Sequence, residues 1–289
     1  NSIYSPVQLK SKVAPPMLHK ACILCDSSDI SPLPEYEEHQ LAVCNDCSFV
    51  FMLRIPTVEE LITHYKTYSY TGTPNQSTIK SYNLLLDYFE QYRKHNSILD
   101  IGCGRGWFLD EAKKRGWRVY GTEFSSDAVK LCESKGIVMK QGDLDVGDFD
   151  NEKFDVVFSS EVIEHVNNPS VQFSKIYSVL RHGGMTYLTT PNWNCYLRRK
   201  YKARYNIIEY PEHLGYFTKK TINKGLTDVG FIKEKLLTTG ITFSRVATDK
   251  PGNVSRTDLK ARDEMLRTAA SGNVVFNFAK RVVNVMLTL

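Results

Sequence analysis

The chain has 289 residues and a formal net charge of +5, with 42% hydrophobic and 24% charged residues. These proportions exclude a disordered tail, a collagen-like chain and a disulfide-rich miniprotein. No stretch approaches about 18 uninterrupted apolar residues, and the first residues lack the apolar region of a secretory signal. We therefore expect a soluble cytoplasmic protein with one large domain and a small appendage.

Four of the seven cysteines form two close pairs, Cys22 with Cys25 and Cys44 with Cys47. The spacer between the pairs lies within the roughly 15–20 residues typical of four-cysteine zinc sites. Two such turns can present four thiolates to one ion, and four thiolates leave no open coordination position. We therefore expect a structural Zn²⁺ site. The alternative is a set of unrelated buried or oxidised cysteines.

The remaining pattern divides the chain into further parts. The N-terminal arm and zinc ribbon occupy residues 1–56, and a linker with a substrate-covering helical segment occupies 57–95. Short apolar runs alternate with amphipathic helices over 96–240, with an insert at 192–217, which is typical of a parallel, doubly wound α/β sheet. The tail, 241–289, is expected to be helical because its apolar residues near the end fit one helix face.

A glycine-rich loop follows the first strand of this sheet. It runs from Asp100 to Gly106 and leads into a helix beginning at Trp107. Gly102 and Gly104 permit positive φ angles and close approach of a ligand, and the helix N-terminus offers N–H groups. Trp107 stands where a dinucleotide fingerprint has its third glycine, so a ligand without a pyrophosphate fits better.

Acidic residues follow the next strands. Glu123 ends the second strand, where a carboxylate can accept hydrogen bonds from ribose hydroxyls. Asp143 lies in an acidic loop suited to an adenine amino group, and Glu161 follows the fourth strand. The carboxyl ends of parallel strands meet at one sheet edge, so we expect these groups to line one ligand site.

The glycine loop, the acid after the second strand and Gly-Asp after the third together resemble class I S-adenosylmethionine-dependent methyltransferases, over residues 94–240. The resemblance implies a Rossmann-like fold and S-adenosylmethionine (SAM) as cofactor. Two alternatives are a fold that binds another nucleotide and a non-catalytic binding protein. The residues that the resemblance assigns to the cofactor are Asp100, Gly102, Cys103, Gly104, Glu123, Phe124, Asp143, Leu144, Ser160 and Glu161.

A narrower resemblance covers more of the chain. The four-cysteine ribbon, the tyrosine-rich stretch after residue 61 and the segment 210–218 look like sugar methyltransferases of glycan and antibiotic pathways. In the zinc-containing deoxysugar C-methyltransferases, the residues matching Tyr210 and His213 face the substrate, and that histidine is the proposed base. Those enzymes continue into a further C-terminal domain, so we favour O-methylation of a sugar or glycan precursor over C-methylation of a ketosugar. Further substrate contacts are expected from Tyr65, Tyr68, Tyr70 and Glu212.

Two histidines are candidates for the base that takes the acceptor proton. We assign this role to His213, the alternative being that it only packs against the helix expected near Thr218. His165 is the rival base. If its segment is helical, Glu161, Glu164 and His165 share one face and form a divalent-metal site. The ubiquinone-pathway O-methyltransferases carry a similar Glu-x-x-Glu-His and need magnesium, but we favour a structural or substrate-lining role over Mg²⁺.

Arg198 and Arg199 open a basic run after the fifth strand. Arginine pairs well with phosphate oxygens, so the run suits a phosphorylated or nucleotide-linked sugar, with a solvated helix face as the equal alternative. Nucleic acid is a further alternative, because some ribosomal RNA methyltransferases carry an N-terminal zinc module. The Ser-Ser-Glu at 159–161 lacks the Asn/Asp-Pro-Pro-Tyr/Phe box used on base amino groups. We therefore expect a small-molecule substrate.

Overall fold

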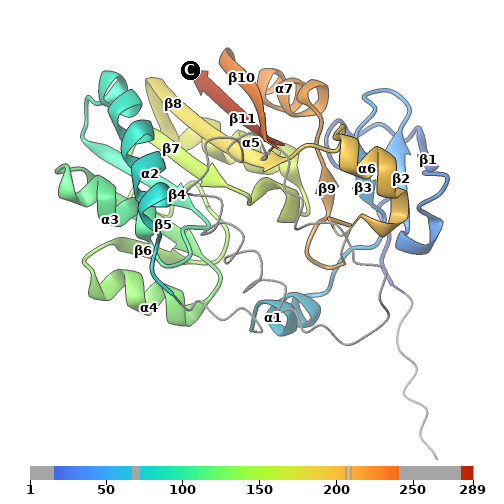
Figure 1. Ribbon diagram of the computed structural model, residues 1–289, viewed down its shortest axis with the longest axis horizontal. Coiled ribbons are helices and arrows are strands. Elements are labelled where there is room, and N and C mark those ends of the chain that lie inside the picture. Colours follow the sequence, from blue (N-terminus) through green and yellow to red (C-terminus); the bar gives the residue numbers. More distant parts are fainter. Residues whose placement is uncertain (1–15, 67–71, 206, 209, 241–280, 289) are drawn as a thin grey trace, which may run out of the picture.

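The computed structural model describes residues 16–66, 72–205, 207–208, 210–240 and 281–288, which form two β-sheets surrounded by helices (Figure 1). None of the helices in these ranges is both long and apolar enough to cross a membrane.

Seven strands form the large sheet, in the order β10-β11-β8-β7-β4-β5-β6. The run from β8 to β6 is parallel, whereas β11 is antiparallel to both of its neighbours. The strand order reverses between β4 and β7, so the sheet is doubly wound, as the sequence predicts. The bounds are β4 (Ser97–Ile101), β5 (Arg118–Glu123), β6 (Val138–Gln141), β7 (Phe154–Ser160), β8 (Leu180–Pro191), β10 (Ile232–Gly240) and β11 (Arg281–Thr288).

The helical prediction for the tail is wrong where the structure describes it. Residues 281–288 form β11, which pairs with β8 on one side and β10 on the other. Val282, Val283 and Val285 fit one face of a helix, but β-branched residues also favour strands. These residues form a strand and not a helix because β8 and β10 pair with the β11 backbone on its two sides. Only the tertiary structure brings those strands together.

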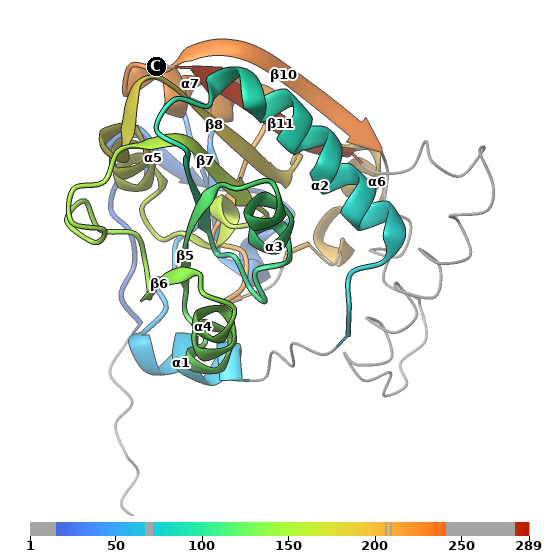
Figure 2. The same cartoon turned by 90° about the vertical axis from the view of Figure 1, so that its left-hand side faces the viewer.

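Helices cover the two faces of the large sheet. On one face, α2 (Gln76–Phe89), α3 (Trp107–Lys114) and α4 (Ser126–Ser134) share a buried cluster. On the other, α5 (Pro169–Val179) and α7 (Lys219–Asp228) share a second cluster. Figure 2 shows α2 running alongside β10. Tyr88 of α2 and Tyr92, four residues later, both donate hydrogen bonds to Glu234 of β10. Short 3-10 helices are η1 (Glu37–His39), η2 (Glu90–Tyr92), η3 (Ile163–His165) and η4 (Lys202–Arg204).

The second sheet combines the cysteine-rich N-terminal part with the insert. Its order is β1 (Ile30–Pro32), β2 (Leu41–Cys44), β3 (Val50–Met52) and β9 (Gly215–Tyr216). The first three strands form antiparallel pairs, and β9 adds the fourth from far along the chain. We call these four strands the cysteine-rich sheet. The two remaining helices are α1 (Val58–Lys66) and α6 (Tyr196–Tyr201).

The cysteine-rich sheet and the large sheet share one core. Cys22, Leu24 and Phe49 lie in the same buried cluster as Phe173 of α5 and Leu226 of α7. Burying each large apolar side chain contributes about 1.5–3 kcal/mol to folding. The shared burial therefore holds the two sheets against each other.

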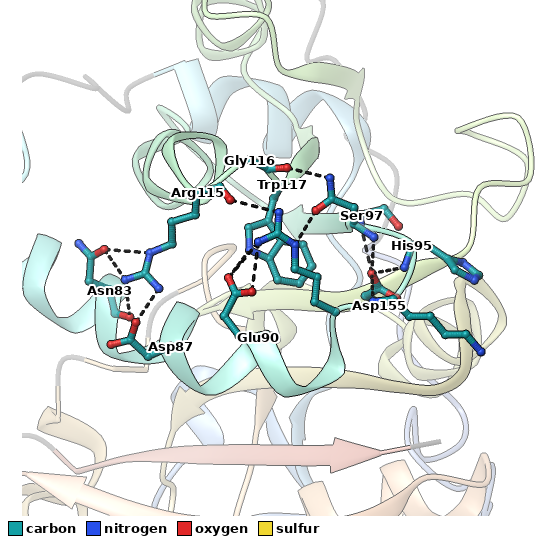
Figure 3. Close-up of polar contacts among 12 residues, drawn as sticks. Asn83, Asp87, Glu90, His95, Ser97, Arg115, Gly116, Trp117 and Asp155 are labelled. Carbon is teal, nitrogen blue, oxygen red and sulfur yellow. Dashed lines mark hydrogen bonds and ion pairs between the residues drawn. The ribbon is translucent and has the colours of Figure 1, made fainter.

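The amino ends of the strands meet in a polar network that Figure 3 shows. The buried Asp155 of β7 accepts backbone hydrogen bonds from Lys94 (2.9 Å), His95 (2.8 Å) and Asn96 (2.6 Å), and it forms an ion pair with Arg181. The network ties β4, β7 and β8 together at the edge opposite the predicted ligand site. Its position indicates a structural role.

Candidate functional site

The glycine loop and the acid of the second strand meet at the carboxyl edge of the large sheet. Gly102 and Gly104 have φ angles of 68° and 53°. The Glu123 carboxylate accepts hydrogen bonds from the backbone N–H groups of Gly104 (3.0 Å) and Ser125 (2.9 Å). A Cβ atom added to Gly102 would lie 2.6 Å from a methyl group of Val162, so only glycine fits there. The loop thus lies between Glu123 and the segment that follows β7.

The other residues assigned to the cofactor lie around this loop at the same edge. Asp100, the penultimate residue of β4, is buried, and burial raises its pKa well above the usual value, with further contributions from Cys132 and Glu123. Leu144 is fully buried, whereas Phe124 is 49% exposed. The backbone N–H of Cys103 donates to the carbonyl of Thr122, and Asp143 follows β6. Their contact with a cofactor stays a prediction.

Ser160 and Glu161 are bound to the neighbouring strand β8. The hydroxyl groups of Ser160 and Thr189 are 2.8 Å apart. Thr189 donates to the Glu161 carboxylate at 3.0 Å, and the Glu161 backbone N–H donates to the Thr189 carbonyl at 2.9 Å. Glu161 has a φ of 57°, so it lies in a turn and not in a helix.

The structure gathers a different set of three residues from the metal site considered in the sequence. Donor atoms of Glu164, His165 and His213, which we call the histidine cluster, all lie within 4.8 Å of one another. Glu164 and His165 lie in the single 3-10 turn η3, so the expected helical face that included Glu161 does not form. His213 completes the group from the insert. Sequence spacing offered no signal for this meeting.

Hydrogen bonds fix the proton positions on both histidines. The Nδ1 atom of His213 lies 2.6 Å from the carbonyl oxygen of Ile207, and that of His165 lies 2.5 Å from the carbonyl of Glu212. A carbonyl only accepts, so each Nδ1 carries the proton and each Nε2 of the neutral ring is basic. The rings meet edge to face with centroids 4.9 Å apart. His213 can therefore accept a proton at Nε2.

Glu164 brings a carboxyl group to the cluster. Its side chain is buried, and its carboxylate accepts a hydrogen bond from the Thr190 hydroxyl at 2.9 Å. An oxygen of the same carboxylate lies 3.9 Å from Nε2 of His165. A carboxylate at this distance favours the protonated form of the imidazole.

Tyr210 links the insert to α1. Its hydroxyl donates to the Glu60 carboxylate at 2.8 Å, and the Arg54 guanidinium lies 4.4 Å from the centre of its ring. Burial and the Glu60 carboxylate raise the pKa of Tyr210 to about 12. These contacts connect Tyr210 to α1, and the catalytic, substrate-facing role that the resemblance implies for it stays a prediction. Of the expected substrate-binding tyrosines, Tyr68, Tyr70 and the side chain of Tyr65 lie outside the described residues.

The two arginines expected to bind phosphate are engaged within the protein. The guanidinium of Arg198 lies 4.6 Å from the centre of the Trp193 ring, and its Nε donates to the Trp193 carbonyl at 3.0 Å. Arg199 donates to the Asn194 side chain at 2.6 Å. These contacts hold α6 against the turn after β8. Contact of either side chain with a phosphate stays a prediction.

The four N-terminal cysteines converge as the sequence predicts. The Sγ atoms of Cys22 and Cys47 are 3.6 Å apart, as are those of Cys25 and Cys44, and all four lie within 4.8 Å of one another as free thiols. A tetrahedral Zn²⁺ with bonds of about 2.3 Å to sulfur requires sulfur–sulfur distances of about 3.8 Å. The donor set therefore fits a structural zinc ion.

Comparisons with known proteins match the large sheet and its carboxyl edge to methyltransferases. A family model described as "Methyltransferase domain" matches residues 78–236. The ubiquinone biosynthesis O-methyltransferase of Glaesserella parasuis is 31% identical over 106 residues, which cover 33% of this chain and 45% of that protein. The mitochondrial ubiquinone biosynthesis O-methyltransferase of Rattus norvegicus is 33% identical over 105 residues, 33% of this chain and 30% of that protein. The matched region thus spans less than half the length of these curated relatives.

Solved structures share the fold. A putative sarcosine dimethylglycine methyltransferase from Galdieria sulphuraria superposes with a TM-score of 0.52 at 12% identity, over 73% of this chain and 84% of that chain. A protein from Pyrococcus horikoshii gives a TM-score of 0.50 at 18% identity, over 78% and 98% of the two chains. The family match covers more than half of the sequence and includes the glycine loop, Glu123 and the histidine cluster. The chain belongs to the methyltransferase-domain family.

Proposed function

We propose that this protein transfers a methyl group from SAM to a hydroxyl oxygen of a small molecule. One observation carries the proposal: Gly102 of the glycine loop packs against Val162, which directly precedes η3 and the histidine cluster. The proposed nucleoside site and the two histidines therefore adjoin at the carboxyl edge of the sheet, where ligands bind in doubly wound folds.

The residues at the loop suit the cofactor. Glu123 would hold the ribose hydroxyls, and the positive φ angles of Gly102 and Gly104 leave the backbone open to close approach. When bound, SAM supplies a methyl group already activated by the sulfonium. The protein then has to align the acceptor oxygen with that methyl group and take up one proton. Alignment of this kind contributes most of the rate enhancement.

His213 is the proposed proton acceptor. Its Nδ1–H bond to Ile207 holds the ring with Nε2 unprotonated, and its side chain is only 9% exposed. A neutral hydroxyl is a poor nucleophile, so a base with a pKa near neutral pH helps to generate the attacking oxygen. His165 and Glu164 flank this base, and an ionised Glu164 carboxylate would favour its protonated form.

A divalent cation is the second candidate for the same cluster. One carboxylate and two imidazoles within 4.8 Å form a donor set that suits a first-row metal ion or, less well, Mg²⁺. A cation there would lower the pKa of an acceptor hydroxyl, so that His213 would act as a ligand and not as a base. Dialysis against EDTA separates the two in protein that elemental analysis shows to have kept its cysteine-bound zinc: an unchanged kcat supports the base, and a loss restored by Mg²⁺ supports the metal.

The acceptor is proposed as a hydroxylated small molecule. The names of the curated relatives support O-methylation. They lend no support to the sugar or glycan acceptor that the sequence resemblance favoured, nor to C-methylation or RNA. We therefore rank phenolic and other ionisable hydroxyls ahead of phosphorylated sugars.

Titration calorimetry with SAM and S-adenosylhomocysteine tests the proposal on folded protein. Glu123→Ala removes two charge-assisted hydrogen bonds to ribose, each contributing about 1.5–3 kcal/mol, so we expect SAM affinity to fall at least tenfold. Methyl transfer from labelled SAM is then assayed on phenols, catechols and phosphorylated sugars. Absence of SAM binding by the wild-type protein would overturn the proposal, and binding without turnover on any acceptor would favour a non-catalytic role.

A further inference from the structure

The residue after His213 links η3 to the cysteine-rich sheet. Leu214, its neighbour, donates its backbone N–H to the carbonyl of Glu164 at 2.7 Å and accepts from the N–H of Met52 at 2.9 Å. Gly215 and Tyr216 then form β9, which pairs with β3 of the cysteine-rich sheet (Figure 1). One residue beside the proposed base is therefore bonded both to η3 and to the cysteine-rich sheet.

Tyr216 reaches back to His213 itself. Its hydroxyl donates to the backbone carbonyl of His213 at 3.0 Å, and its ring packs against Trp193 with centroids 5.0 Å apart. Only 3% of Tyr216 is exposed, and burial raises its pKa, so the hydroxyl stays a donor at working pH. The imidazole is fixed separately by Ile207. His213 is thus held at both its backbone and its ring.

The same strand region connects with the cysteine cluster. Cys44 of β2 donates its backbone N–H to the carbonyl of Phe49, one residue before β3. The Phe49 ring packs on Phe217 with centroids 4.8 Å apart. A Cβ atom on Gly215 would lie 3.0 Å from Phe49, so β9 fits closely against this hairpin. The hairpin that carries two of the cysteines therefore also supports the strand that follows His213.

We propose that the cysteine-rich sheet is a positioning device for His213, with Tyr216 as the positioning residue that transmits the alignment. The inference rests on the proposed function, because it takes His213 as the proton acceptor. Removing the Tyr216 hydroxyl leaves the buried carbonyl of His213 without this donor and loosens the backbone under the base. A displacement of about 1 Å can cost on the order of 10²-fold in rate, so a partial loosening is expected to cost about tenfold.

The test compares Tyr216→Phe with Tyr36→Phe. Both tyrosines are nearly fully buried, and both pack on Trp193, with centroid distances of 5.0 and 5.3 Å. The two hydroxyl groups differ in their partners, because that of Tyr36 accepts a hydrogen bond from the Arg198 guanidinium. We expect Tyr216→Phe to lower kcat about tenfold with the Kd for SAM unchanged, and Tyr36→Phe to stay within about twofold of wild type. Equal losses in both variants would overturn the inference.

A second comparison separates this inference from the proposed function. In a His213→Ala background, Tyr216→Phe should cause no further loss of kcat, because the two residues act as one unit. A full additional tenfold loss there would overturn the positioning role while leaving His213 as the base. A wild-type kcat for His213→Ala alone would overturn the proposed role of His213.

A spectroscopic readout covers the case in which Tyr216→Phe is less stable. The ¹H–¹³C NMR signal of the His213 ring, assigned by its absence in His213→Ala, is titrated with pH in wild type and in both Phe variants. All spectra are taken at a temperature where circular dichroism shows every variant folded. A changed His213 shift or pKa in Tyr216→Phe alone supports the proposal, and identical titrations overturn it.

Discussion

The imidazoles of His165 and His213 meet edge to face at 4.9 Å, although one follows β7 and the other lies in the insert. Each ring donates its Nδ1–H to a backbone carbonyl, Glu212 for His165 and Ile207 for His213. The two side chains therefore have the same tautomer. Because His165 donates to the residue that precedes His213, the two histidines also support each other's position.

We expect the two histidines to respond differently to removal. His213→Ala should lower kcat by about 10²–10⁴-fold with the Kd for SAM unchanged, because it removes the proposed base. His165→Ala should cost less, since it removes a neighbour and a support of that base. Initial rates with calorimetric SAM affinities check both variants. The reverse order of effects would make His165 the base.

Tyr210→Phe should weaken the attachment of α1 to the insert more than it lowers kcat. The change removes the hydrogen bond to Glu60 but keeps the ring beneath Arg54. A hydrogen bond to a charged group contributes about 1.5–3 kcal/mol when buried, and partial exposure reduces this, so we expect about 1 kcal/mol of coupling with Glu60→Gln. A double-mutant cycle from urea unfolding measures the coupling. A loss of kcat comparable to that of His213→Ala would instead make Tyr210 catalytic.

Asp155 should make stability depend on acid pH. Burial alone would raise its pKa, but hydrogen bonds from Arg181 and from the backbone of His95 and Lys94 outweigh burial and lower it. A lowered pKa in the folded state stabilises the protein fully above the unfolded value of about 4, and this contribution is lost as pH falls through the folded pKa. Unfolding free energies measured from pH 7 down to pH 2 should show the decline.

Asp155→Asn tests the same network. It leaves the partly buried Arg181 without its charge partner, so we expect a loss of about 2 kcal/mol at pH 7. The variant should also show a shallower decline toward acid pH, because the titrating group is gone. Asp145→Asn is the matched control, since Asp145 forms an exposed pair with Lys175. Equal acid sensitivity in Asp155→Asn and wild type would contradict the assignment.

Cys25→Ser should remove a metal and destabilise the cysteine-rich sheet. The predicted zinc content is one ion per wild-type chain, and structural zinc sites contribute directly to folding. We expect the variant to lose zinc by elemental analysis and to unfold at a lower temperature. Cys195→Ser is the control, because Cys195 caps α6 outside the cluster and serine is a good cap. Zinc-free wild-type protein of full stability would refute the site.

The sequence by itself determined the parts that depend on local chemistry. Two residues separate the cysteines within each pair, so each pair can present both thiolates from one turn, and the glycine loop follows its strand because Gly102 and Gly104 tolerate positive φ. Glu123 reaches the loop because parallel strands present their carboxyl ends at one edge. Each of these predictions needs only neighbouring residues and the rules of a parallel sheet.

Tertiary structure alone decided the contacts between distant segments. Only the folded chain brings His213 to Glu164 and His165, pairs β9 with β3, and places β11 between β8 and β10. In each case a short segment of ambiguous local preference takes its conformation from partners far along the chain. Those partners supply the contacts that the segment cannot provide for itself.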